Sequence, residues 1–277
     1  YYWPGTFGPF HNGHRYLLDK LRAYIRYQEN LDTPENPTQR IIFIVPITNN
    51  KGLRAYEKDP AYTGFLYERV ASILLQLADV DRKQVFITTR LQPLPAQAGS
   101  VERSISVTSL NLAAKIEEGF HRKGRVGGLD IETVVVFGAD EFGWKGKEGQ
   151  RKLTIRQPGK ATRKCVAFGR GGYLIDLMAN GDGITRYTDA DVVLAPGISG
   201  SGSSEAIKEL HLGRSGMFMP HAIPFILRHW DLKSINRRKE ELNLPKKEQE
   251  ESIPSVNEIR TELASEYRRI LIELKML

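Results

Sequence analysis

Short apolar runs rich in β-branched residues alternate along this chain with segments whose apolar residues recur every three or four positions. The runs are typical of strands buried on both faces, and the wider spacing is typical of amphipathic helices. The predicted strands span 40–47, 85–89, 132–138, 164–169 and 191–195. The predicted helices span 14–28, 65–79 and 106–120. This alternation predicts an α/β fold, in which a parallel sheet lies between helices on both faces and the crossovers are right-handed.

The α/β pattern ends near residue 230, so we expect a main domain over 1–230 and a charged linker with an amphipathic helix over 231–277. The interleaved charges of 235–252 predict a solvated surface. Ser255 and Glu258 have the spacing of a capping box. An apolar stripe then follows one helix face at Val256, Ile259, Leu263, Tyr267, Ile270, Leu274 and Leu277. The stripe predicts packing either on the parent domain or on a second copy in a homo-oligomer.

Composition narrows the class of protein. The 277 residues are 40% hydrophobic and 26% charged, which is ordinary for a globular protein. No apolar run reaches the roughly 18 residues that span a bilayer, and no signal-peptide pattern is present. We therefore expect no membrane partner. The single cysteine, Cys165, lies in the apolar run "KCVAFG", which predicts a small buried thiol and a reducing, cytoplasmic compartment.

Charge points to the kind of ligand. Lysine and arginine number 40 against 33 acidic residues, giving a net charge of +7. An excess of this size suits a phosphate-rich ligand. No segment interleaves basic and aromatic residues in the way that single-stranded nucleic-acid surfaces do, so we expect no nucleic-acid partner.

The stretch "GTFGPFHNGH" (Gly5–His14) carries the candidate chemistry. We expect Tyr1–Pro4 to be the end of a first strand and, because the sequence does not begin with methionine, a few residues to precede it. In open α/β sheets ligands bind at the carboxyl ends of strands, often where a glycine-rich turn leads into a helix N-terminus. Gly5 and Gly8 would let the backbone approach a phosphate closely, and His14 would open the helix.

Two histidines three residues apart, His11 and His14, suit the same ligand. Both imidazoles can donate hydrogen bonds to one polyphosphate, and Gly13 between them would leave room for the nucleotide. Ligation of a metal by this pair is one alternative, but a third ligand and a His-Glu-x-x-His arrangement are both missing from the stretch. A purely structural role is the other alternative.

The turn resembles the signature of the nucleotidylyltransferase superfamily, Gly-x-Phe-x-Pro-x-His-x-Gly-His, which holds ATP or CTP. Class I aminoacyl-tRNA synthetases share a related His-x-Gly-His turn, but this chain has no loop similar to Lys-Met-Ser-Lys-Ser. The resemblance implies a doubly wound, Rossmann-like parallel sheet. It also implies ATP-binding residues at Gly5, Thr6, Phe7, His11 and His14.

Further stretches resemble the nicotinamide and nicotinate mononucleotide adenylyltransferases, in the order that this family has them. They are "NNKGLRAY", "YERVASILLQLAD", "SVTSL", "FGADEFGWK", "VAFGRGGYLID", "GSSEAIKEL" and "MPHAIPFILRHWDL". The resemblance implies mononucleotide-binding residues at Lys51, Arg69, Thr108, Trp144 and Arg170. It implies further ATP-binding residues at Gly138, Asp140, Ser203, Ser204 and Lys208.

The chain also departs from the family pattern. Gly8 stands where the family has aspartate or asparagine, which removes a side chain near the ligand. Glu205 stands where threonine is usual, and Lys208 stands where arginine is usual. Lysine keeps the charge but loses the bidentate fork, and Glu205 either repels a phosphate or caps its helix. The run "ISGSG" leaves the serine register open between Ser199 and Ser201 on one side and Ser203 and Ser204 on the other.

The resemblance implies transfer of AMP from ATP, which carries Mg²⁺, to nicotinamide or nicotinate mononucleotide, giving a dinucleotide and pyrophosphate. His11, His14 and Lys208 would be the catalytic residues. Two alternatives stay open: a related transferase with another acceptor, such as phosphopantetheine or a phospho-alcohol, and a non-catalytic domain that binds a nucleotide and senses it. The choice between nicotinamide and nicotinate stays open too.

Overall fold

The core of the molecule is a twisted parallel sheet. The computed structural model describes residues 1–35, 38–47, 60–81, 83–89, 91–92, 112–113, 116, 131–138, 144–145, 151–152, 165–168, 190–194 and 202–242. Within these residues the sheet has six strands in the order β3-β2-β1-β4-β7-β8, all paired in parallel. The strands are β1 (Tyr2–Gly5), β2 (Ile42–Pro46), β3 (Val85–Ile87), β4 (Val135–Gly138), β7 (Cys165–Phe168) and β8 (Ala190–Leu194).

The strand order reverses direction between β1 and β4. Numbered along the chain within the sheet, the order is the Rossmann order 3-2-1-4-5-6. The Tyr2 amide donates to Val134 O at 2.8 Å, and the β1–β4 register holds at Tyr2↔Val135 alone. Pro4, two residues further along, faces the same neighbour and has no N–H to donate. The ladder between β1 and β4 therefore ends before the carboxyl ends of the two strands.

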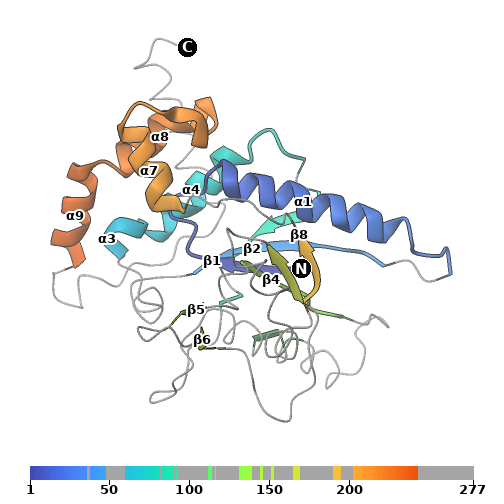
Figure 1. Cartoon of the computed structure of the whole chain (residues 1–277). Coiled ribbons are helices and arrows are strands. Elements are labelled where there is room, and N and C mark those ends of the chain that lie inside the picture. Colours follow the sequence, from blue (N-terminus) through green and yellow to red (C-terminus); the bar gives the residue numbers. More distant parts are fainter. Residues whose placement is uncertain are drawn as a thin grey trace.

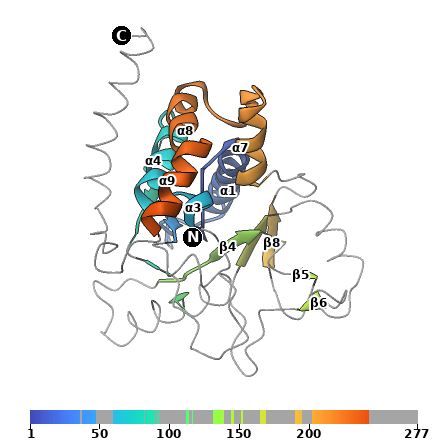
Figure 2. The same ribbon diagram turned by 90° about the vertical axis from the view of Figure 1, so that its left-hand side faces the viewer.

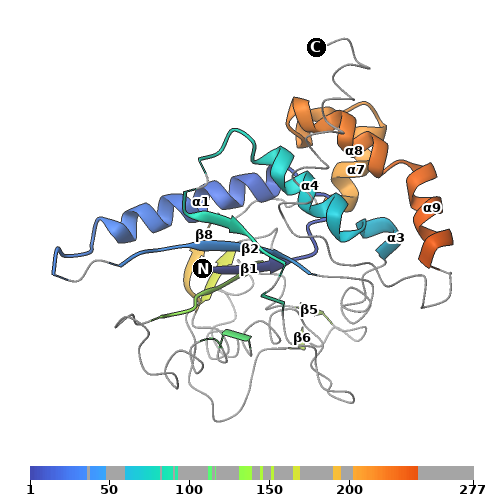
Figure 3. The ribbon, with the colours of Figure 1, turned by 180° about the vertical axis from the view of Figure 1, so that it is seen from behind.

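The described helices gather on one face of the sheet and at one end of it. They are α1 (Asn12–Glu29), α3 (Pro60–Thr63), α4 (Leu66–Gln76), α7 (Ser203–His211), α8 (Ile223–His229) and α9 (Leu232–Leu242). In Figure 1, α1 and α4 lie over the sheet. Figures 2 and 3 show α3, α7, α8 and α9 grouped together, and in Figure 3 the arrow of β1 points toward this group. The carboxyl end of β1 therefore points toward this group of helices.

Two hydrophobic clusters hold these layers together. The first joins α1 and α4 to the sheet and contains Trp3, Phe7, Phe10, Leu18, Leu21, Ile25, Ile42, Ile44, Ile73, Leu77, Val85, Val136, Val166 and Phe168. The second joins α4 to α7 and α8 and contains Leu66, Val70, Ala71, Leu74, Leu75, Ala206, Leu210, Phe218, Ala222, Phe225, Ile226 and Trp230. Helix α4 contributes to both clusters because most of its residues are buried. It is the element that ties the sheet to the group of helices at the end of β1.

The predicted α/β fold, with its parallel sheet, is confirmed. Each predicted strand is present with ends shifted by up to a few residues, and the helices predicted over 14–28 and 65–79 are α1 and α4. Of the helix predicted over 106–120, the structure describes only residues 112, 113 and 116, which are helical, and the helix predicted over 255–277 lies outside the described residues. A small antiparallel pair, β5 (Trp144–Lys145) with β6 (Arg151–Lys152), was not predicted. Among the described helices, none combines the length and the apolar character needed to cross a membrane.

The charged stretch after residue 230 corrects one expectation. Residues 232–242 form α9, which contacts α3 and α8. Ile235 and Arg238 on this helix are buried, at 7% and 0% exposure. The interpretation of 235–252 as a solvated surface is therefore wrong at these two positions. Interleaved charge does not reveal that one arginine has a buried carboxylate as its partner.

Candidate functional site

The candidate site is the turn between β1 and α1, referred to below as the histidine turn (residues 5–14). It begins at the last residue of β1, and His11 is the N-cap of α1. The neighbouring strand β4 ends at Gly138, one of the predicted ATP-binding residues. The histidine turn thus lies at the carboxyl ends of the two strands between which the strand order reverses. Open α/β sheets bind their ligands at this position.

The two histidines cap the helix with their own rings. His11 Nδ1 accepts a hydrogen bond from the Gly13 amide at 3.1 Å, and His14 Nδ1 accepts one from the His11 amide at 3.3 Å. A neutral imidazole that accepts at Nδ1 carries its proton on Nε2. Both rings are therefore held as Nε2–H donors, with their centroids 4.1 Å apart. Imidazole donors of this kind suit phosphate oxygens, and the His11 ring is buried, at 3% exposure.

The structure gives a packing reason for glycine at position 13. A Cβ at this position would lie 2.7 Å from Cε1 and 2.9 Å from Nδ1 of His11. Real Cβ atoms do not approach other atoms so closely, so any side chain here displaces the His11 ring. We expected Gly13 to make room for the nucleotide. In the structure it makes room for the imidazole that caps the helix.

Two phenylalanines of the histidine turn, Phe7 and Phe10, pack against the His14 ring. The His14 ring stacks on Phe10 with a centroid distance of 4.9 Å and meets Phe7 edge-on at 5.4 Å. Phe7 has φ = 46°, a left-handed conformation that costs a residue with a Cβ about 1–2 kcal/mol. Packing of Phe7 against Trp3 and Phe10, at centroid distances of 5.5 and 5.7 Å, offsets this cost. The orientation of the His14 ring is thus fixed by buried neighbours.

Gly8 is required by packing. A Cβ at Gly8 would lie 2.0 Å from the carbonyl oxygen of Thr63, the last residue of α3. We expected the glycine to remove a side chain on the ligand side of the turn. The structure shows that the space beside Gly8 is filled by backbone. The departure from aspartate or asparagine at this position therefore goes together with the close approach of α3.

Arg69 and Ser72 of α4 form hydrogen bonds with the backbone of the histidine turn. The Arg69 guanidinium donates to Thr6 O at 2.9 Å and to Gly64 O at 3.0 Å, and the side chain is fully buried. The Phe10 amide donates to the Ser72 hydroxyl at 3.0 Å. Direct contact of Arg69 with a mononucleotide stays a prediction. Sequence reasoning missed Ser72, although a serine within the apolar run "VASILL" was a visible signal.

The start of α7 lies against the histidine turn. The Ser203 hydroxyl donates to Pro9 O at 2.9 Å, and the Asn12 side chain donates to Gly216 O at 2.9 Å in the segment that follows α7. The N-cap of α7 is Gly202, which has no side chain to bond the first amides of the helix. Helix N-termini without a side-chain cap present N–H donors and partial positive charge to anions. Two helix N-termini, those of α1 and α7, thus meet at one turn.

The remaining predicted residues divide into two groups. Ser204 and Lys208 are exposed, and their i,i+4 spacing puts them on one face of α7, together with the exposed Glu205 in its first turn. Trp144 begins β5, and only its backbone is described. The other predicted positions lie outside the described residues: Lys51, Thr108, Asp140, Arg170, Ser199 and Ser201.

An ion pair anchors the first turn of α1. Arg15 donates to Gln76 O at 3.0 Å and to both carboxylate oxygens of Asp79 at 2.5 and 2.7 Å. The hydrogen bond from Arg15 lowers the pKa of the Asp79 carboxyl, against a smaller opposing effect of desolvation. The pair ties the residue after His14 to the end of α4. Within the part of the chain that the structure describes, no cluster of three or more His, Cys, Asp or Glu side chains could hold a metal ion.

Comparison with known proteins gives a structural likeness only. No protein-family model matches the chain, and neither does any curated protein sequence. Among solved structures, the chain is similar to Plasmodium falciparum nicotinic acid mononucleotide adenylyltransferase complexed with NaAD, with a TM-score of 0.47 and 16% identity. The match covers 82% of this chain and 94% of that one. Residue roles do not transfer at this identity.

Proposed function

We propose that this chain is an adenylyltransferase that transfers AMP from ATP to nicotinamide or nicotinate mononucleotide. The observation that carries the proposal is the meeting of two helix N-termini at the histidine turn. His11 and His14 supply side-chain donors on one side, and the hydrogen bond from Ser203 to Pro9 brings the first amides of α7 to the other. A triphosphate lying across this turn meets donors along its length.

The reaction needs no base to generate its nucleophile, because the acceptor phosphate is already anionic near neutral pH. One of its oxygens attacks the α-phosphorus of ATP, a new P–O bond forms, and the bond from the α-phosphorus to the α,β-bridging oxygen breaks. The bridging oxygen leaves with the pyrophosphate. Mg²⁺ enters as part of the substrate, bound to ATP oxygens. Catalysis then rests on in-line positioning and on stabilisation of charge at the phosphoryl oxygens.

Each part of the turn has a task in this mechanism. The Nε2–H groups of His11 and His14 donate to the α and β phosphates as negative charge grows there. The amides at Ser203 and Ser204 hold the departing pyrophosphate, with Lys208 one turn further along α7. Gly5, Thr6 and Phe7 provide the backbone along which ATP lies, and Gly138 and Asp140 border the adenosine.

The acceptor side is assigned by the family resemblance alone. Lys51 binds the phosphate of the mononucleotide, and Arg69 contributes on the same side. Trp144 stacks on the pyridine ring. Thr108 and Arg170 contact its amide or carboxylate.

Pyrophosphate release tests the proposal. The chain is incubated with MgATP and with nicotinamide mononucleotide, nicotinate mononucleotide, 4′-phosphopantetheine or no acceptor. We expect release that depends on a pyridine mononucleotide. Release that depends on phosphopantetheine would assign a different acceptor, and ATP binding without release for any acceptor would favour the non-catalytic sensor.

A further inference from the structure

Residues 60–65, called the α3–α4 segment below, lie between the histidine turn and α9. On the side of the turn, Thr63 is so close to Gly8 that no Cβ fits between them. Arg69 donates one hydrogen bond to a carbonyl of the segment and another to a carbonyl of the turn. The position of this segment therefore sets the position of the backbone that precedes the histidines.

On its other side, the segment is held by α9. Arg238 Nε donates to Ala61 O at 2.7 Å, and its Nη1 donates to both carboxylate oxygens of Glu68 at 3.0 and 3.1 Å and to His229 O at 2.6 Å. Glu68 in turn accepts the Phe65 amide at 2.7 Å. Arg238 of α9 and Glu68 of α4 thus hold the α3–α4 segment by hydrogen bonds near both of its ends, at Ala61 and at Phe65.

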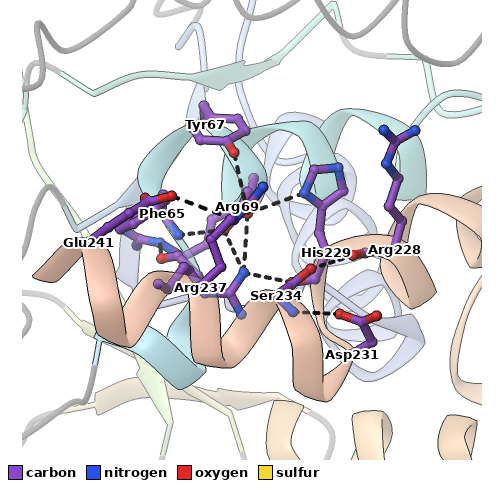
Figure 4. A network of polar contacts seen from close by, with 12 residues as sticks. Phe65, Tyr67, Arg69, Arg228, His229, Asp231, Ser234, Arg237 and Glu241 are labelled. Carbon is purple, nitrogen blue, oxygen red and sulfur yellow. Dashed lines mark hydrogen bonds and ion pairs between the residues drawn. The ribbon is translucent and has the colours of Figure 1, made fainter.

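The Glu68–Arg238 pair has no exposed surface, and further polar groups surround the carboxylate. Both side chains are 0% exposed. His229, Tyr67 and Arg237 lie 3.2, 3.4 and 3.5 Å from Glu68 Oε1, and Figure 4 shows these three side chains within one network of polar contacts. A fully buried pair is costly to break, because removal of either partner leaves the other charged and desolvated. The contact of α9 with the α3–α4 segment is therefore costly to lose.

We propose that Arg238 and Glu68 are positioning residues for the histidine turn. The proposal rests on the proposed adenylyltransferase function for its kinetic consequence, but not for its structural one. Arg238 of α9 fixes the position of the α3–α4 segment through its hydrogen bond to Ala61 O. Arg69 then fixes the position of Thr6 relative to that segment, because it bonds both Gly64 O and Thr6 O. When the pair is broken, the turn relaxes and the two Nε2–H donors leave the positions that the phosphates require. Helix α9, the last described element of the chain, thereby determines the geometry of the histidine turn that follows β1, the first strand.

Two variants and two readouts test the coupling. Arg238→Met and Glu68→Gln each remove one side of the pair. The readouts are kcat and KM for pyrophosphate release, and the imidazole ¹⁵N chemical shifts of His11 and His14, which report the tautomer and the capping bonds. We expect kcat to fall about tenfold to a hundredfold, since a displacement of about 1 Å is sufficient for such a loss, and the imidazole shifts to change. Folded variants with the parent kcat and the parent shifts would overturn the proposal.

Matched controls separate positioning from loss of charge or stability. Lys233→Met removes one positive charge from the same helix at an exposed position and is expected to leave kcat and the imidazole shifts unchanged. Val85→Ala weakens the core at the edge strand β3 and serves as a variant of lowered stability. If it changes the histidine signals as much as Arg238→Met does, general destabilisation explains the effect and the proposal fails.

A conservative variant covers the case in which Arg238→Met does not fold. Arg238→Lys keeps a positive charge beside Glu68 but loses the planar fork that also reaches Ala61. We expect it to fold, with lowered kcat and altered imidazole shifts, and a parent-like result for both readouts would contradict the proposal. If the parent chain itself releases no pyrophosphate, the proposed function fails, while the imidazole shifts of the same variants still decide the structural coupling.

Discussion

Ser203 and Pro9 are 194 positions apart in the chain, and the hydroxyl of the first donates to the carbonyl of the second at 2.9 Å. This contact brings the N-terminus of α7 to the histidine turn. It joins two stretches that the family resemblance places on the same triphosphate. The first prediction concerns this bond.

Ser203→Ala should loosen α7 from the histidine turn. The variant loses one hydrogen bond and leaves a carbonyl without that donor, at a cost of about 1 kcal/mol in the free energy of unfolding. We also expect KM for ATP to rise, because the first amides of α7 are no longer held beside the turn. Urea unfolding and steady-state kinetics measure both effects. Ser204→Ala, at an exposed position on the same helix turn, is the stability control, and an equal loss there would contradict this account of Ser203.

Substitutions of His14 can separate its cap from its donor. Asparagine offers a side-chain oxygen near the position of Nδ1 but has no Nε2–H. His14→Asn should therefore keep the thermal midpoint close to that of the parent while kcat falls about a hundredfold to a thousandfold, as when one oxyanion donor is removed. His14→Ala should lose the cap as well, at about 1 kcal/mol. If His14→Asn keeps full activity, the ring serves the helix alone.

Gly8 and Gly216 form a matched pair for the packing argument. A Cβ at Gly8 meets Thr63 O at 2.0 Å, whereas a Cβ at Gly216 meets nothing within 4 Å. Gly8→Ala should lower the free energy of unfolding by about 1–3 kcal/mol, as overpacking does. Gly216→Ala should stay within about 0.5 kcal/mol of the parent. Denaturant titrations of the two variants provide the comparison, and similar stability for both would remove the packing reason for glycine at position 8.

The buried carboxylate of Glu68 should make stability depend on pH. Burial raises its pKa, but the hydrogen bond with His229 and the charge of Arg238 outweigh burial, and the pKa is lowered below the ordinary value of 4.5. A lowered folded-state pKa contributes stability that is present above pH 4.5 and lost as pH falls through the folded-state pKa. Unfolding measured from neutral pH to about pH 3 should show a steeper loss for the parent chain than for Glu68→Gln. Parallel curves for the two proteins would contradict this ionisation.

Much of the sheet could be predicted, because a buried parallel strand needs a run of apolar, β-branched residues and little else. "RIIFIVPI" and "DVVLA" carry that signal, and β2 and β8 lie within about a residue or two of the predicted bounds. The sequences of strands β5 and β6, "WK" and "RK", are too short and too polar to show a hydrophobic period.

The candidate site could be predicted only in part. The histidine turn is local, so its motif was visible in ten consecutive residues. The burial of Arg238 depends on Glu68, 170 positions earlier, and no pattern within α9 records it. The need for glycine at position 8 also depends on a distant residue, because Thr63 approaches Gly8 only in the folded chain. Side chains that depend on distant partners need the topology before they can be placed.

The most direct test of the central claim is pyrophosphate release from MgATP in the presence of nicotinamide or nicotinate mononucleotide, measured for the parent chain and for His14→Asn. We predict release that requires a mononucleotide and falls about a hundredfold or more in the folded variant. Mononucleotide-dependent release that is unchanged in His14→Asn would contradict the role of the histidine turn. No release from a folded parent chain that binds ATP would contradict the adenylyltransferase function itself.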